Sequence, residues 1–197
     1  GTPIAGRDRT ELEGVLGYFV NMLVMRTDLG GDPGFVDLVE RVRRDTLDAW
    51  ANQDVPFERL VAELNPPREI GRNPLFQVSF AVQNWGEVPL ALPGVQAESV
   101  PIRSIQAKFD LSVSVTEAAD RFEVQFGYNR DLFDHATIER MARHFRILLE
   151  GIAANPGEKL SALPMMDEGE ADRLLAQWND TAREFPANET VHRLFEA

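Results

Sequence analysis

The chain has 197 residues, 44% of them hydrophobic and 26% charged, which is enough apolar material for one sizeable core with an appendage. The formal net charge of -12 argues against a nucleic-acid or anionic-membrane partner, because such partners are bound by clustered Lys and Arg. The absence of cysteine excludes disulfides, a thiolate nucleophile and a cysteine-type zinc site, and favours a cytoplasmic protein.

No apolar run approaches the roughly 20 residues needed to cross a bilayer, and the N-terminus lacks the pattern of a signal peptide. The abrupt start at Gly1 is what we expect of a fragment.

The first half of the chain predicts a loop, a strand and two helices. Residues 1–16 are polar and turn-rich, which predicts a loop leading into the first strand. The run 18–27 is apolar on both faces and short, so it favours a strand buried on both sides, with a helix as the open alternative. Proline is tolerated in a first turn, so Val55-Pro56 predicts the start of a short helix that ends at 65–67. Between these, a one-sided apolar pattern predicts a longer amphipathic helix through Phe35, Leu38, Val39, Val42, Thr46, Leu47 and Trp50.

Three later segments alternate apolar and polar residues with period two, at 76–82, 109–115 and 122–128, and each predicts a half-buried strand. The short polar interval 117–121 predicts an antiparallel hairpin between the last two. The stretch 86–107 is rich in proline and weakly periodic, which predicts an extended crossing segment outside the core.

The C-terminal third predicts two helices and a linker. Asp134 is placed to cap a long helix that ends at 155–157, and Asp167 with Glu170 forms a capping-box pattern that begins a small one. Residues 179–188 form a polar linker. The mixture of strands with flanking helices predicts an α/β (α+β) sandwich with a mixed sheet.

The residues offer little catalytic machinery. The histidines, His135, His144 and His192, are isolated in sequence, so we predict no metal site and assign them no catalytic role. Asp131 and Asp134 fit helix caps better than an acid and base pair. No phosphate-cradling loop, dinucleotide fingerprint or nucleophile elbow is present.

Three sequence blocks carry a family resemblance: LGYFVNMLVMR at 16–26, NQDVPFERLVAELNP at 52–66 and GRNPLFQVSF at 71–80. In order and spacing they resemble the motifs of condensation domains of non-ribosomal peptide synthetases. The stretches 107–115 and 129–145 look like later elements of the same family. The tail, with Trp178-Asn179-Asp180-Thr181 as its clearest signature, resembles the join to an adenylation domain.

This resemblance implies an architecture of two lobes related to chloramphenicol acetyltransferase. Residues 1–157 would be the C-terminal lobe and 158–197 the start of the linker toward an adenylation domain. In the family, a tunnel between the lobes joins an amine to a thioester, both held on the phosphopantetheine arms of peptidyl carrier proteins, largely by proximity.

The family's catalytic motif is His-His followed three residues later by Asp-Gly. It belongs to the N-terminal lobe and is absent from this sequence. The resemblance therefore implies a fragment that supplies one tunnel wall, contributes no catalytic residue, binds no cofactor itself and is inactive without its N-terminal lobe.

By the same resemblance, Asn21, Arg72, Asn73 and Gln77 are candidates for substrate-tunnel or lobe-bridging residues. Arg72 and Asn73 equally fit a structural role, binding backbone carbonyls before a strand. Asn52 stands where relatives often carry histidine, which leaves a proton-transfer role there in doubt. The remaining positions of that motif are Gln53, Asp54, Pro56 and Phe57.

The resemblance also assigns 86–107 to a latch that adds to the partner lobe's sheet and 2–16 to a floor loop beneath the tunnel. Both assignments imply exposed apolar surface in the isolated chain. The alternative to a part of an amide-forming enzyme is a non-catalytic docking or structural module for carrier and adenylation domains. A free-standing acyltransferase would need a general base that this chain lacks.

Overall fold

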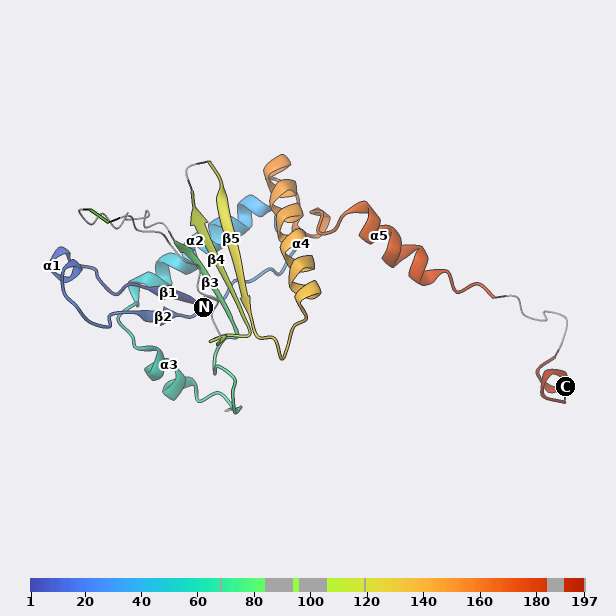
Figure 1. The fold of residues 1–197 in the computed structure, drawn as a ribbon, viewed down its shortest axis with the longest axis horizontal. Helices are drawn as coiled ribbons and strands as arrows, with labels where there is room; N and C mark the ends of the chain where they lie inside the picture. Colours follow the sequence, from blue (N-terminus) through green and yellow to red (C-terminus); the bar gives the residue numbers. More distant parts are fainter. Residues whose placement is uncertain (68, 84–93, 96–105, 119, 184–189, 197) are drawn as a thin grey trace.

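The main sheet has three strands, β3 (Val78–Gln83), β4 (Leu111–Glu117) and β5 (Phe122–Tyr128) (Figure 1). The computed structural model describes residues 1–67, 69–83, 94–95, 106–118, 120–183 and 190–196. β3 runs parallel to β4, and β4 pairs antiparallel with β5. The predicted hairpin is confirmed, because the Ala118 amide donates to the Arg121 carbonyl at 2.8 Å. The predicted latch, 86–107, falls mostly outside the described residues.

A second, two-stranded sheet extends the first. β1 (Thr2–Ile4) pairs antiparallel with β2 (Asn21–Leu23). Gly1 joins this pair to β3: its amino group donates to the Val78 carbonyl at 2.7 Å, and its carbonyl accepts from the Phe80 amide at 2.9 Å. Hydrogen bonding therefore connects the strands in the order β2, β1, β3, β4, β5.

Two predictions for this N-terminal region were wrong in part. Residues 1–16 are not all loop, because they contain β1 and the short helix α1 (Thr10–Glu13). Of the strand expected at 18–27, only β2 forms, and it is not buried on both sides, because Leu23 is buried whereas Asn21 and Met22 are only half buried. Tyr18, before the strand, is 87% exposed. Of this apolar run, Leu23 is the residue that is buried in the core.

The predicted helices are confirmed as α2 (Phe35–Ala51), α3 (Phe57–Leu64), α4 (His135–Ala154) and α5 (Glu168–Leu175). Asp134 occupies the N-cap position of α4, but its side chain makes no capping hydrogen bond, contrary to prediction. Asp167 does cap α5, accepting from the Glu170 amide at 2.8 Å. None of the described helices has the length and hydropathy needed to span a membrane.

The main sheet has one apolar face and one polar face. The register places the apolar alternating residues of the three strands side by side, namely Val78, Phe80, Val82, Leu111, Val113, Val115, Val124, Phe126 and Tyr128. α4 covers the β5 end of this face, where the rings of Phe126 and Phe145 meet edge to face at 6.2 Å.

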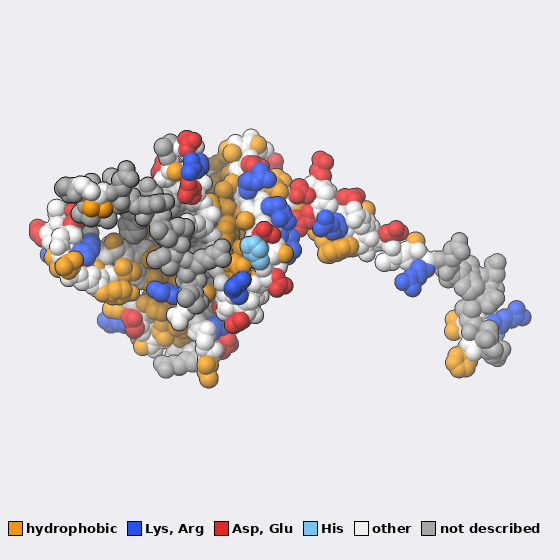
Figure 2. Space-filling model, viewed as in Figure 1, with side chains coloured by type: hydrophobic (Ala, Val, Ile, Leu, Met, Phe, Trp, Pro, Cys, Tyr) orange, Lys and Arg blue, Asp and Glu red, His pale blue; other side chains and the backbone are white. Residues whose placement is uncertain are grey.

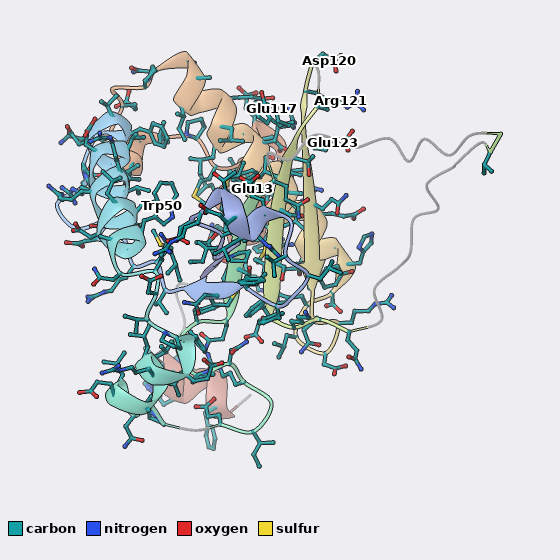
Figure 3. All side chains as sticks on the ribbon, turned by 90° about the vertical axis from the view of Figure 1, so that its left-hand side faces the viewer. Glu13, Trp50, Glu117, Asp120, Arg121 and Glu123 are labelled. Atoms are coloured by element: carbon teal, nitrogen blue, oxygen red, sulfur yellow. The ribbon has the colours of Figure 1, made fainter. Side chains whose placement is uncertain are left out.

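The β3 end of the apolar face lies beside α2 and is poorly covered. A groove of about 960 Å³ separates them, and Trp50 of α2 lies on its sheet-facing side (Figure 3). Phe80 is 43% exposed and Val82 61% exposed. In Figure 2, hydrophobic side chains reach the surface over the region of β1 and β2 and beside the sheet. The apolar surface expected in the isolated chain is therefore present.

The C-terminal segment begins on the lobe and then leaves it. A bridge between Gly34 and Lys159 fixes its start, and Asp32 accepts from the Ser161 amide at 2.9 Å and hydroxyl at 2.7 Å. The short helices η1 (Leu160–Ala162) and η2 (Gln177–Asn179) flank α5, and α6 (Val191–Glu196) follows. α5 and α6 extend away from the sheet (Figure 1).

Candidate functional site

The side chain of Asn21 binds β2 to the turn between α2 and α3. Its Nδ2 donates to the carbonyls of Gln53 and Val55, both at 2.9 Å. Its Oδ1 accepts from the amides of Met22 at 2.9 Å and Phe57 at 3.3 Å. Both donors and both acceptor sites of the amide are thus used. Asn21 therefore brings the sequence blocks 16–26 and 52–66 together.

These two blocks enclose a small cavity of about 380 Å³. Its wall contains every position of the second motif singled out from sequence, together with Asn21 and the apolar residues before it; the lining is Gly6, Tyr18, Phe19, Val20, Asn21, Met22, Gln53, Asp54, Pro56, Phe57 and Glu58. We call this cavity the β2–α3 pocket. Asp54 is exposed there, and Pro56 occupies the N-cap position of α3.

Gly6, which lines the β2–α3 pocket, and its neighbour Arg7 were not singled out as site residues from the sequence. Gly6 has φ of +61°, and a Cβ there would collide with the carbonyl oxygen of Phe19. The guanidinium of Arg7 lies 4.3 Å from the centre of the Phe19 ring, at cation–π distance. Arg7 also donates to the Leu12 carbonyl. A single glycine in a polar loop gives no pattern from which this packing could be read.

Arg72, Asn73 and Gln77 form a separate cluster around a cavity of about 180 Å³. Gln77 donates to the Asn73 carbonyl at 2.9 Å, and Asn73 donates to the Lys108 carbonyl at 3.4 Å. Arg72 pairs with Glu69 at 3.0 Å, with both side chains more than half exposed. The structure thus brings these three together, but in a cavity other than the one that Asn21 lines.

Aromatic rings connect the two clusters. The rings of Phe57 and Phe76 meet edge to face at 5.7 Å, and those of Phe76 and Phe109 stack at 5.4 Å. Phe57 begins α3, whereas Phe76 and Phe109 precede β3 and β4. The cluster therefore joins the blocks 52–66 and 71–80, and the hydrogen bonds of Asn21 tie the block 16–26 to the first of these.

The histidines lie away from both cavities. His135 Nδ1 lies 3.1 Å from the Tyr128 hydroxyl, His144 Nε2 lies 2.8 Å from a Glu170 oxygen, and His192 lies beside Thr190. None of them lines the β2–α3 pocket or the Arg72 cavity. In the described part of the chain, no group of three or more acidic, histidine or cysteine side chains is arranged to hold a metal ion.

Comparison with known proteins identifies a matching family and similar proteins. Residues 1–175 match the family model described as "Condensation domain". One of the linear gramicidin synthase proteins of Brevibacillus parabrevis is 46% identical over 198 residues, which cover 98% of this chain and 4% of that protein. Chondramide synthase of Chondromyces crocatus is 42% identical, covering 98% of this chain and 5% of that protein.

Two solved structures share the fold. The X-domain from teicoplanin biosynthesis superimposes with a TM-score of 0.76 at 31% identity, covering 84% of this chain and 38% of that one. A four-domain nonribosomal peptide synthetase bound to AMP and glycine gives a TM-score of 0.77 at 24% identity, covering 86% of this chain and 14% of that one. The chain thus spans a small part of the proteins that it matches.

Proposed function

Because the chain belongs to the condensation-domain family of nonribosomal peptide synthetases, we propose that it forms one wall of a reaction chamber in which amide bonds join aminoacyl or peptidyl thioesters. The opposite wall is an N-terminal condensation lobe that carries the His-His-x-x-x-Asp-Gly motif. The substrates arrive on the phosphopantetheine arms of peptidyl carrier proteins. This chain itself holds no cofactor and supplies no catalytic base.

The convergence of the three sequence blocks carries this proposal. Asn21 and the aromatic cluster hold residues from all three in one region, with Gln53 and Asp54 on one cavity and Arg72, Asn73 and Gln77 on the other. Such polar groups suit the orientation of amide and thioester groups by hydrogen bonding. The histidines lie outside both cavities, so we propose that this chain positions the substrates and takes no part in proton transfer.

The open groove beside β3 suits a lobe that packs against further protein. We assign residues 1–157 to this lobe, with 2–16 as a floor loop and 86–107 as a latch, and 158–197 to a linker toward an adenylation domain. The uncovered face of Val78, Phe80 and Val82 provides apolar area for the remainder of the condensation domain.

The direct test is reconstitution. The chain is mixed with a separately produced N-terminal condensation lobe and with carrier proteins loaded with donor and acceptor aminoacyl groups, and dipeptidyl-carrier product is measured by mass spectrometry. We expect product only when both lobes are present. Product from this chain alone would overturn the assignment of the base to the other lobe.

A second candidate function is a non-catalytic docking module for carrier and adenylation domains. It is favoured by the similar X-domain, whose solved structures include a complex with OxyB. In the same reconstitution, complex formation with carrier proteins on a gel-filtration column, without amide product in the presence of an active N-terminal lobe, would select this function.

A further inference from the structure

The short contact between the His144 ring and the Glu170 carboxylate joins α5 to α4. His144 Nε2 and Glu170 Oε2 lie 2.8 Å apart, and Arg140 Nε lies 3.9 Å from Glu170 Oε1. The side chains of His144 and Glu170 are only 20% and 16% exposed. The other ion pairs of the described residues join side chains that are about half exposed or more, apart from Arg140 with the same Glu170. A carboxylate so withdrawn from water is costly to leave unpaired.

Glu170 makes this contact instead of completing its own helix cap. In a capping box, the acidic residue at the third helical position returns to the backbone amide of the cap residue. Here Asp167 caps the helix by accepting from the Glu170 amide, while the Glu170 carboxylate reaches α4. The Glu170 side chain, which the sequence pattern predicts to cap α5, therefore contacts α4 instead.

The apolar side chains of α5 contribute little to this attachment. Leu175 is 76% exposed and Trp178, just after the helix, is 67% exposed. Figure 2 shows hydrophobic side chains at the surface of the arm that carries α5. Between α4 and α5 lies a space of about 720 Å³, lined on the α4 side by Ala136, Glu139, Arg140, Arg143 and His144. Leu174 lines this space and is half buried, whereas His144 and Glu170 form the most withdrawn polar contact between the two helices, and we take this contact to set the orientation of α5.

We propose that the Glu170 carboxylate, held by His144 and Arg140, is a clamp that fixes α5 in one orientation on α4 and thereby sets the direction in which the chain leaves the lobe. Releasing the clamp frees α5 to swing about the exposed segment 165–167, because Leu163 before it is buried. The clamp is a conformational device of this chain's own residues and does not depend on the proposed amide-forming function. Where that function holds, the clamp sets the position of the domain that follows.

The test is a distance measurement on the complete 197-residue chain. The sequence has no cysteine, so Ala153→Cys on α4 and Leu175→Cys at the end of α5 place one spin label on each helix. Pulsed electron paramagnetic resonance of the parent pair should give one narrow distance distribution. Glu170→Ala and His144→Ala should each lower the ratio of clamped to released chains roughly tenfold, the loss expected for a hydrogen bond to a charged group, and broaden the distance distribution.

Two control variants distinguish loss of the clamp from a general loss of stability. Glu150→Ala removes an exposed glutamate paired with Arg146 on α4 and should leave the distribution unchanged. His144→Gln keeps an N–H donor facing Glu170 and should retain most of the narrow population. The melting temperature of the lobe should be the same in all variants. A broad distribution in the parent chain, or a narrow one in Glu170→Ala, would overturn the proposal.

Discussion

The two ends of the main sheet differ in how their shared apolar face is covered. At the β5 end, α4 lies against the sheet and the rings of Phe126 and Phe145 meet at 6.2 Å. At the β3 end, a groove of about 960 Å³ separates the strand from α2, and Val78, Phe80 and Val82 remain 43 to 61% exposed. The same alternation of residues thus produces a packed half and an open half.

The contrast indicates that the strand pattern specifies a face to be covered and does not specify what covers it. Exposed apolar patches on soluble proteins mark surfaces that meet another body. We propose that this body is the rest of the condensation domain. Met25 of the first family block and Phe76 and Gln77 of the third line the groove at this open half, so the candidate residue Gln77 borders it.

The strongest effect of a single substitution is expected on the packed half. Phe126→Ala should lower the free energy of unfolding by about 3 kcal/mol, because it removes a ring packed against α4 and leaves a cavity. The matched change on the open half, Phe80→Ala, should cost only about 1 kcal/mol, because much of that ring already contacts water. Urea denaturation of both variants measures this, and equal losses would show that the two halves are packed alike.

A smaller effect is expected where polar bonds organise the open half. Asn21→Ala should lower the free energy of unfolding by about 2 kcal/mol, because four hydrogen bonds are lost and the carbonyls of Gln53 and Val55 lose their donors. Amide hydrogen exchange at Phe57 should also accelerate. Asn52→Ala removes one exposed bond to the Asp48 carbonyl and is the control. An Asn21→Ala variant with unchanged exchange at Phe57 would refute the positioning role.

The smallest effect on stability is expected at the contact between Asp32 and Ser161, where the C-terminal segment begins. The side-chain and backbone hydrogen bonds from Ser161 lower the pKa of Asp32 from its ordinary value of 3.8. Because the folded-state pKa is the lower one, this stabilisation is complete above about pH 4 and is lost as the pH falls through the folded value. In the Asp32→Asn variant, the melting temperature should therefore decrease less as the pH is lowered below about 4. Asp120→Asn, at the hairpin tip shown in Figure 3, removes the same charge and should leave the acid dependence of the melting temperature unchanged.

Local pattern predicted the elements that bury one face. The period-two strands at 76–82, 109–115 and 122–128 and the one-sided helix from Phe35 to Trp50 all formed. The pairing of Gly1 with β3 could not be predicted, because Gly1 and Val78 are 77 positions apart and backbone hydrogen bonds leave no side-chain pattern. The strand expected at 18–27 formed only over Asn21–Leu23, since hydrophobicity alone does not say whether a core lies on either side.

The candidate site was predictable only as a list of residues. The resemblance named Asn21, Gln53 and Asp54, but the bond from an asparagine to carbonyls on another element follows from three-dimensional position alone. It also grouped Arg72 with Asn21, whereas the structure places them on different cavities. Glu170 was correctly placed at a helix start, yet its carboxylate binds His144, a contact that helix-capping rules do not anticipate.

Hydrogen–deuterium exchange of the chain with and without the N-terminal condensation lobe is the decisive experiment for the open half. We expect slower exchange in β3 and in the end of α2 that carries Trp50, where the sheet face is open. Exchange in α4, which already covers the other end, should not change. Protection confined to α4, with β3 and α2 unaffected in a mixture that forms amide product, would contradict the assignment of the open half to the partner lobe.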